Sequence, residues 1–131
     1  MELQYTKHFT LEEAQRTLPL VKQIVRDILN LSHEIRTLIT ILGADAEENP
    51  QIQQLMEQFK GYLRELEELG CFYKDWNFSI GLVDFPAIIN GEEVFLCWRS
   101  DEDEIQYYHG IYDGYAGRKL IPGAKKVRKS R

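Results

Sequence analysis

The fold is decided by the stretch Leu82-Val-Asp-Phe-Pro-Ala-Ile-Ile-Asn-Gly-Glu-Glu-Val-Phe-Leu-Cys-Trp-Arg99. At its centre, Asn90 and Gly91 both tolerate the positive φ angles of a type I′ turn, which predicts an antiparallel hairpin. With these two residues as the turn, one face of the hairpin is wholly apolar, and this agreement supports the register. That face holds Val83, Phe85, Ala87, Val94, Leu96 and Trp98. Pro86 has no N–H group, so its strand is an edge or carries a bulge there.

The opposite face of the same hairpin is polar. It places Asp84 directly opposite Cys97 and diagonal to Arg99, within reach of a salt bridge. The acidic turn 100–103 then predicts a third strand from Glu104 to His109. With a simple four-residue turn, the polar face holds Asp84, Cys97, Arg99, Glu104, Gln106 and Tyr108, and His109 falls on the other face beside Trp98. We interpret the polar cluster either as a solvated sheet face or as a site.

Upstream of the hairpin, the spacing of apolar residues predicts a long helix. Thr10 and Glu13 form a capping box at its start. Pro19 then predicts a short helix over 10–18, followed by a kink or a restart and a long helix to about Leu42. The apolar residues that recur at spacings of three and four are Val21, Ile24, Ile28, Leu31, Ile35, Leu38 and Leu42.

A second amphipathic helix follows after a loop over 44–49. Asn49 and Pro50 are suited to the N-cap and first helical positions, and Gly70 ends the helix. Its apolar seam is Ile52, Leu55, Phe59, Tyr62, Leu66 and Leu69. The short loop makes the two helices antiparallel neighbours. The periodicity leaves open whether their seams meet each other, the sheet or a second chain, so a homodimer is one interpretation.

These elements predict an α+β fold in which an antiparallel helix pair, kinked at Pro19, packs on a small antiparallel β-meander. Residues 1–121 form one domain and 122–131 a basic tail. No apolar run approaches the ~20 residues that span a bilayer. The N-terminus has no signal peptide and the chain has two cysteines, which favours a reducing cytoplasm.

Charge is unevenly distributed along the chain, whose net charge is −5. Residues 114–131 hold seven bases and no acid, whereas residues 1–113 hold nine bases and 21 acids. The tail contacts the body or an external polyanion, or it only solubilises the terminus. An acidic body repels phosphate, and no recognised nucleic-acid motif is present, which argues against nucleic acid as a partner.

Few patterns in the chain are typical of catalysis. There is no CxxC or HExxH, and the three histidines lie far apart. His109 beside aromatic residues is typical of a hydrogen-bonded core residue. Cys97 is interpreted as buried and inert, with a nucleophile activated by Arg99 as the alternative. The glycine-rich segment 110–118 matches no P-loop, but its backbone, with Arg99 and Arg118, offers contacts to an anion.

Several motifs in one order resemble the prokaryotic family catalogued as domain of unknown function 2203. They are Phe9-Thr-Leu-Glu-Glu-Ala14 with Leu18-Pro19, Gly81-Leu-Val-Asp-Phe-Pro86, Leu96-Cys-Trp-Arg99, Glu104-Ile-Gln-Tyr-Tyr-His109 and Gly114-Tyr-Ala-Gly-Arg118. The resemblance runs from Phe9 to Ile121. It implies metal binding, and the matching residues able to hold a divalent transition metal are Asp84, Glu104 and His109, with Glu13 as a further carboxylate.

Three functions are compatible with these observations. The first is a small metal- or anion-binding protein whose small-molecule ligand the sequence does not identify. The second is a cofactor-free interaction module that dimerises or docks through the helical hairpin. The third is a metal-dependent hydrolase, which requires an open coordination position.

Overall fold

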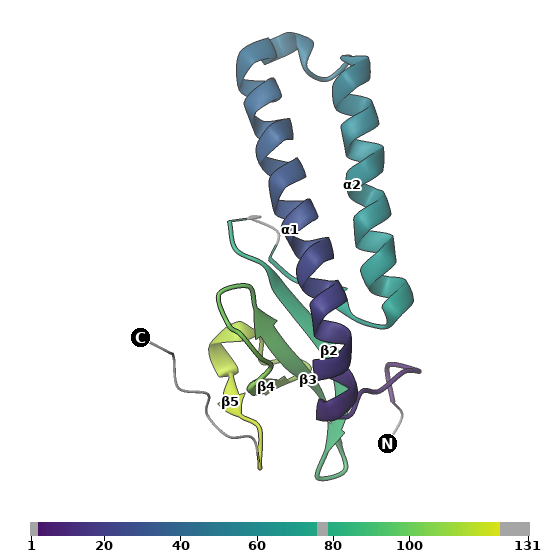
Figure 1. Ribbon diagram of the computed structural model, residues 1–131, viewed down its shortest axis with the longest axis vertical. Helices are drawn as coiled ribbons and strands as arrows, with labels where there is room; N and C mark the ends of the chain where they lie inside the picture. Colours follow the sequence, from purple (N-terminus) through teal and green to yellow (C-terminus); the bar gives the residue numbers. More distant parts are fainter. Residues whose placement is uncertain (1–2, 76–78, 124–131) are drawn as a thin grey trace.

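The computed structural model describes residues 3–75 and 79–123 and confirms the α+β class (Figure 1). The elements in order are α1 (Leu11–Leu42), η1 (Gly43–Asp45), α2 (Pro50–Leu69), β1 (Phe72–Tyr73), β2 (Leu82–Ile89), β3 (Glu92–Arg99), β4 (Tyr107–Gly110), η2 (Tyr115–Gly117) and β5 (Lys119–Leu120). Within the described residues, five strands form one antiparallel sheet in the order β1-β2-β3-β4-β5.

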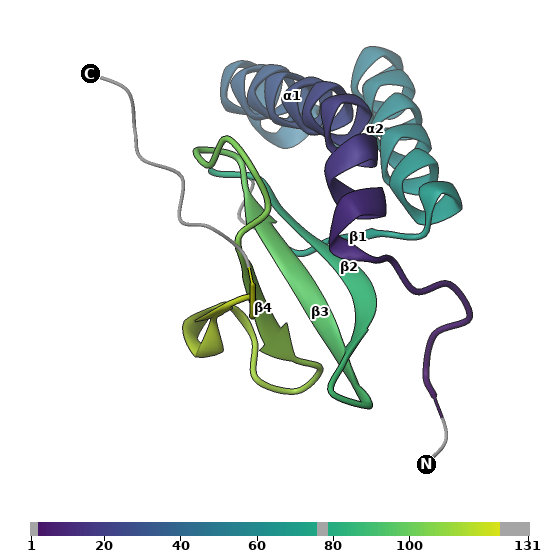
Figure 2. The ribbon, with the colours of Figure 1, turned by 60° about the horizontal axis from the view of Figure 1, so that its bottom comes forward.

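Helix α1 begins at the predicted capping box. The Glu13 N–H donates to Thr10 Oγ1 at 3.1 Å, and the Thr10 N–H donates to Glu13 Oε1 at 3.0 Å. Of the two alternatives predicted at Pro19, a kink or a restart, the restart is wrong, because α1 continues through Pro19 to Leu42. Its first turns nevertheless run at an angle to the rest, as a proline inside a helix produces (Figure 2). The helix persists through Pro19 with Leu18 before it and Val21 after it, both buried in the core.

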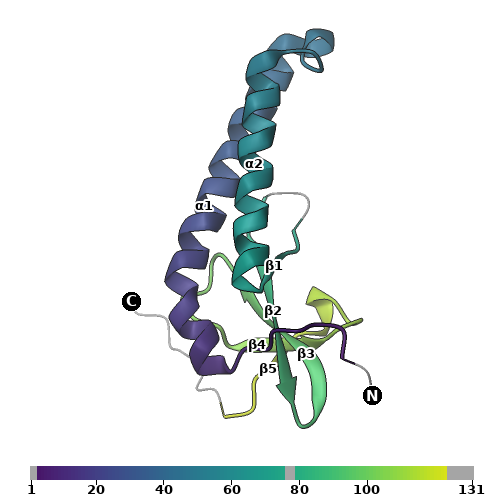
Figure 3. The same cartoon turned by 90° about the vertical axis from the view of Figure 1, so that its right-hand side faces the viewer.

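Helices α1 and α2 are antiparallel neighbours, as predicted. Asn49 Oδ1 accepts a hydrogen bond from the Ile52 N–H, Pro50 is the first helical residue, and Gly70 ends α2 at φ 101°. The buried seams of both helices belong to one core with the apolar face of the sheet, so they pack within the chain. The far half of the helix pair extends beyond the sheet as an arm (Figures 1 and 3).

The β2–β3 hairpin has the predicted register. Asn90 (φ 53°) and Gly91 (φ 80°) form the turn, and Val83 lies opposite Trp98 while Asp84 lies opposite Cys97. Strand β1 pairs with β2 at Val83 and Asp84, so Pro86 lies beyond this ladder, on a part of the β2 edge where no strand requires its missing N–H. The Pro86 carbonyl there accepts a hydrogen bond from the Phe9 N–H at 2.7 Å.

The predicted register of the third strand is wrong by one residue. Strand β4 begins at Tyr107 rather than Glu104, and it pairs Cys97 with Tyr107 and Phe95 with His109. A shift of one residue moves every side chain of a strand to the other face. His109 therefore lies on the same face as Asp84 and Cys97, and not beside Trp98.

A contact with α1 lies directly before this strand. The Gln15 side-chain amide donates to the Ile105 carbonyl at 3.0 Å and accepts from the Ile105 N–H at 3.0 Å. Both backbone groups of Ile105 are thus occupied by a helix residue, and its side chain is buried in the core. The chain cannot pair with β3 until it has passed this contact, so the connection is longer than the simple turn.

The two faces of the sheet have different coverings. The inner face, Val83, Phe85, Ala87, Val94, Leu96 and Trp98, packs in the core with the helices. The outer face carries the side chains of Asp84, Phe95, Cys97 and His109. Figures 2 and 3 show the segment after β4, with η2, and the N-terminal residues on the side of the sheet away from α1. Tyr5 packs edge-on against Phe95, with ring centroids 5.3 Å apart.

The C-terminal part of the described chain joins the core through Ile121. This residue is buried, and its N–H donates to the Gln106 carbonyl at 2.9 Å. Most of the basic tail predicted for 122–131 lies outside the described residues. Among the helices that are described, none has the length and apolar composition needed to cross a membrane.

Candidate metal site

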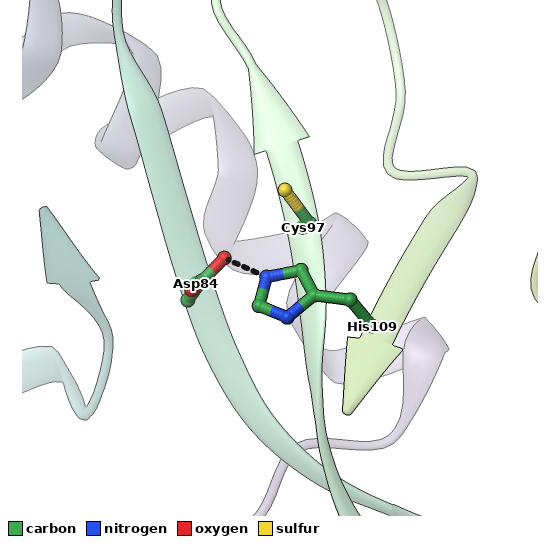
Figure 4. Close-up of side chains that lie close together, drawn as sticks. All are labelled: Asp84, Cys97 and His109. Atoms are coloured by element: carbon green, nitrogen blue, oxygen red, sulfur yellow. Dashed lines mark hydrogen bonds and ion pairs between the residues drawn. The ribbon is translucent and has the colours of Figure 1, made fainter. Parts of the chain in front are cut away.

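Three side chains of types that ligate metals meet on the outer face of the sheet (Figure 4). Asp84 comes from β2, Cys97 from β3 and His109 from β4. One ligand atom from each, a carboxylate oxygen, the thiol sulfur and an imidazole nitrogen, lie within 4.8 Å of one another. The three residues are only 3%, 1% and 3% exposed. Such a buried polar cluster is unusual on a sheet face and requires an explanation.

The surroundings of His109 orient its ring. Nδ1 lies 2.8 Å from the Gly110 carbonyl oxygen, and this contact requires Nδ1 to carry a proton. Nε2 lies 3.2 Å from Asp84 Oδ1. Burial lowers the pKa of His109, but the hydrogen bond with Asp84 and the Asp84 charge raise it, and the net pKa is above the ordinary value. Both ring nitrogens thus face acceptor oxygens, an arrangement that favours the protonated ring and a buried ion pair with Asp84 when no metal is bound.

Cys97 is a thiol rather than a thiolate when no metal is bound. Burial, followed by the negative charge of Asp84, raises its pKa to about 12. A thiol of this pKa is a poor nucleophile at neutral pH, so the geometry does not favour the nucleophile alternative. A metal cation next to the sulfur reverses this preference, because coordination deprotonates a thiol.

A cavity of about 230 Å³ opens beside the three residues. Its other walls are Lys74, Leu82, Phe95, Ile111, Gly114 and Tyr115. The Lys74 ammonium lies 4.8 Å from the centroid of the Phe95 ring. The cavity is therefore mostly apolar, with the metal-ligating side chains on one wall and one cationic side chain on another.

The structure brings together two of the residues predicted to hold a metal and separates the others from them. Asp84 and His109 are in contact. Glu104 is exposed in the segment before β4. Glu13 remains in the capping box at the start of α1. Glu104 and Glu13 are not part of the cluster formed by Asp84, Cys97 and His109.

The two arginines predicted to contact an anion already have carboxylate partners. Arg99 pairs with Asp101 at 2.5 Å and not with Asp84, and it donates to the Tyr115 hydroxyl. Arg118 Nη2 donates to both carboxylate oxygens of Glu102, at 2.6 and 2.8 Å. These pairs leave less positive charge for an external anion than the sequence suggested.

Two residues of this site are absent from the metal ligands that the sequence predicts. The hairpin register places Cys97 opposite Asp84, in the polar cluster interpreted as a possible site, but its own side chain is interpreted as buried and inert; the pairing with Asp84 is the signal that was available. Lys74 follows β1, where its N–H donates to the Leu82 carbonyl at 2.8 Å. No motif in the sequence marks Lys74, because its place beside the cavity depends on how β1 joins the sheet.

Comparison with protein families agrees with the resemblance seen in the motifs. Residues 7–121 match the family described as "Uncharacterized conserved protein (DUF2203)". The chain belongs to this family. Asp84, Cys97 and His109 all lie within the matched segment. Neither the curated proteins nor the solved structures yielded a match.

Proposed function

We propose that this DUF2203 protein binds one divalent transition metal ion through Asp84, Cys97 and His109. The observation that carries the proposal is the convergence of three different ligand types, from three strands, within 4.8 Å in a buried position. Structural pairing alone would not require the cysteine, whereas a thiolate, an imidazole and a carboxylate together are a typical transition-metal ligand set.

The spacing of the donors supports the proposal. In a tetrahedral zinc site the ligand atoms are about 3.3–3.6 Å apart, given zinc–ligand distances of about 2.0–2.3 Å. His109 Nε2 and Asp84 Oδ1 are already 3.2 Å apart. A side-chain rotation that moves the Cys97 sulfur by about 1 Å would bring it within this range of the other two ligand atoms. Zinc accepts all three donor types, so it is the metal that we expect first.

The hydrogen bond from His109 to Gly110 adds support. Metal-ligating histidines usually donate their second N–H to a carbonyl or a carboxylate, which fixes the ring and leaves the other nitrogen for the metal. His109 has this arrangement, with Nδ1 bonded to Gly110 and Nε2 directed toward Asp84.

Three protein ligands leave a coordination position open, and the adjoining cavity gives that position space for water or a small molecule. A metal-dependent hydrolase requires such an open position, and turnover assays with the metal-loaded protein test that alternative. A reducing cytoplasm would suit the site, because Cys97, which is unpaired, would stay available as a ligand.

The test is elemental analysis of untagged protein after incubation with Zn²⁺ and gel filtration. We expect about one equivalent of metal in wild type and less than a tenth of that in Asp84→Asn, Cys97→Ser and His109→Gln. Glu104→Gln and Cys71→Ser are matched controls, because they alter a carboxylate and a buried cysteine outside the cluster. Circular dichroism verifies that each variant is folded.

Two results would contradict the proposal. One is the absence of metal from folded wild type after incubation with zinc, iron and manganese. The other is a stoichiometry that Glu104→Gln reduces and His109→Gln leaves unchanged.

The helical arm is a second candidate site of function. It extends beyond the sheet and exposes Ile39, Ile41 and Met56, which are 45%, 71% and 38% exposed. A homodimer formed through the arm would cover these side chains. Sedimentation velocity of wild type and Ile41→Glu over a hundredfold range of concentration tests it. A mass that stays monomeric throughout would count against the arm as an interface.

A further inference from the structure

The composition of the cavity beside the metal ligands indicates what binds there. Leu82, Phe95 and Ile111 provide apolar walls. Within the described residues, Lys74 forms no ion pair with a carboxylate, and its exposed side chain places the ammonium 4.8 Å from the centroid of the Phe95 ring. An unpaired cation at the border of an apolar cavity is suited to an anionic ligand with an apolar part.

The charge balance of the metal-loaded site indicates the net charge of the ligand that the cavity binds. When a divalent cation is bound, the carboxylate of Asp84 and the thiolate of Cys97 neutralise it, and His109 ligates as a neutral ring. Lys74 then carries the remaining charge among the residues that line the cavity. One negative charge on the ligand would therefore balance the site.

The type of anion follows from the donors available. Phosphate sites usually combine several arginines, a helix N-terminus or a glycine-rich nest. Here the glycine-rich segment 110–118 reaches the cavity through Gly114, but the neighbouring guanidinium groups of Arg99 and Arg118 are paired with Asp101 and Glu102. A single ammonium matches one carboxylate better. The volume of about 230 Å³ is below the roughly 300 Å³ at which pockets for drug-sized ligands begin.

We infer that the cavity binds a small organic monocarboxylate, whose carboxylate pairs with Lys74 and whose apolar part lies against Leu82, Phe95 and Ile111. A donor atom next to the carboxylate occupies the open position on the metal. This inference rests on the metal site proposed above and names its ligand class.

The experiment uses the full-length protein loaded with Co²⁺, whose stoichiometry is measured first. The probes are 2-hydroxy-3-methylbutanoate and its amide, which have nearly the same shape and differ in charge. Calorimetry gives the affinity, and the visible spectrum of Co²⁺ reports ligation. We expect the carboxylate to bind at least about tenfold more tightly than the amide and to change the spectrum.

Variants of Lys74 test the role of its charge. Lys74→Met keeps most of the aliphatic stem and should reduce the preference for the carboxylate to less than about threefold. Lys74→Arg should restore part of that preference. Lys119→Met, which changes an exposed lysine of β5, should leave the affinities unchanged.

The outcomes separate this inference from the metal proposal. With one equivalent of Co²⁺ bound, equal binding of the acid and the amide overturns the ligand class alone. An unaltered preference in Lys74→Met, or tighter binding of inorganic phosphate, overturns it as well. If folded wild type takes up no metal, both proposals fall.

Discussion

The two faces of the central hairpin differ although they are built from alternating residues of the same strands. The inner face has only apolar side chains, such as Phe85 and Trp98, and packs in the core with the helices. The outer face holds Asp84, Cys97 and His109, which are equally buried. Burial alone therefore does not separate core from site in this protein.

The two faces differ in whether a substitution would mainly lower stability or mainly remove metal binding. Inner-face side chains contribute through apolar burial and close packing. Outer-face polar groups are costly to bury, and their pairing mainly offsets that cost, so they add less to stability than apolar side chains of similar size, although removal of one partner of a pair is destabilising. We therefore expect substitutions on the two faces to separate stability from metal binding.

The largest expected effect is on stability, from an inner-face substitution. Phe85→Ala should lower the free energy of unfolding by about 3–5 kcal/mol, since Phe85 is fully buried and a cavity would remain. Urea denaturation measures the change. The matched control is Ile88→Ala in the same strand, where the side chain is 42% exposed and the loss should be about 1 kcal/mol or less.

The comparison of the faces would be broken if Phe85→Ala changed stability by less than Ile88→Ala. It would also be broken if folded Phe85→Ala protein lost its metal, because the inner face would then be needed for the site itself.

A somewhat smaller effect is expected in the pH dependence of metal binding. Burial and the Asp84 charge raise the pKa of Cys97 to about 12, so its thiol is protonated near neutral pH. The pKa of His109 is raised against the effect of burial, and its Nε2 faces the Asp84 carboxylate, which favours a proton there. Zinc binding should release up to two protons, and the affinity should therefore increase with pH, by up to about a hundredfold per unit at low pH. Calorimetry in buffers of different ionisation enthalpy counts these protons. Binding without proton release would exclude Cys97 thiolate as a ligand.

The metal-free protein should show the opposite trend in stability. The folded-state pKa of His109 is raised, mainly by Asp84 against the effect of burial, so its ion pair stabilises the fold fully below about pH 6.5. That contribution is lost as the pH rises through the raised folded-state pKa. Asp84→Asn should remove this pH dependence, which urea denaturation at several pH values measures.

The smallest expected effect concerns Gln15, the residue of α1 that contacts the segment before β4. Gln15 makes two hydrogen bonds with Ile105, and we infer that this contact sets the register of β4. Gln15→Ala should lower the free energy of unfolding by about 1–2 kcal/mol. It should also weaken zinc binding, since His109 depends on that register. Gln53→Ala, an exposed position of α2, serves as the control. Unchanged zinc affinity in Gln15→Ala would show that the register has another cause.

Local patterns were sufficient where the structure depends on near neighbours. The turn Asn90-Gly91 fixed the register of the hairpin, and the capping box, Asn49 and Gly70 marked helix ends. The prediction at Pro19 was correct about the kink and wrong about a restart, because packing of Leu18 and Val21 continues the helix. The turn and the helix ends are decided by residues close together in the sequence, whereas the continuation of α1 through Pro19 depends on packing.

The sequence by itself determined that Asp84 and Cys97 face each other on the side of the hairpin away from the core. Only the tertiary structure decided that His109 joins them, since β4 pairs with β3 one residue away from the register that a simple turn gives. It also decided that Lys74 borders the cavity. The physical reason is the period of two in a strand: one step of register moves a side chain across the sheet, and we infer that this step is set by Gln15, which lies 90 positions away from Ile105 in the chain.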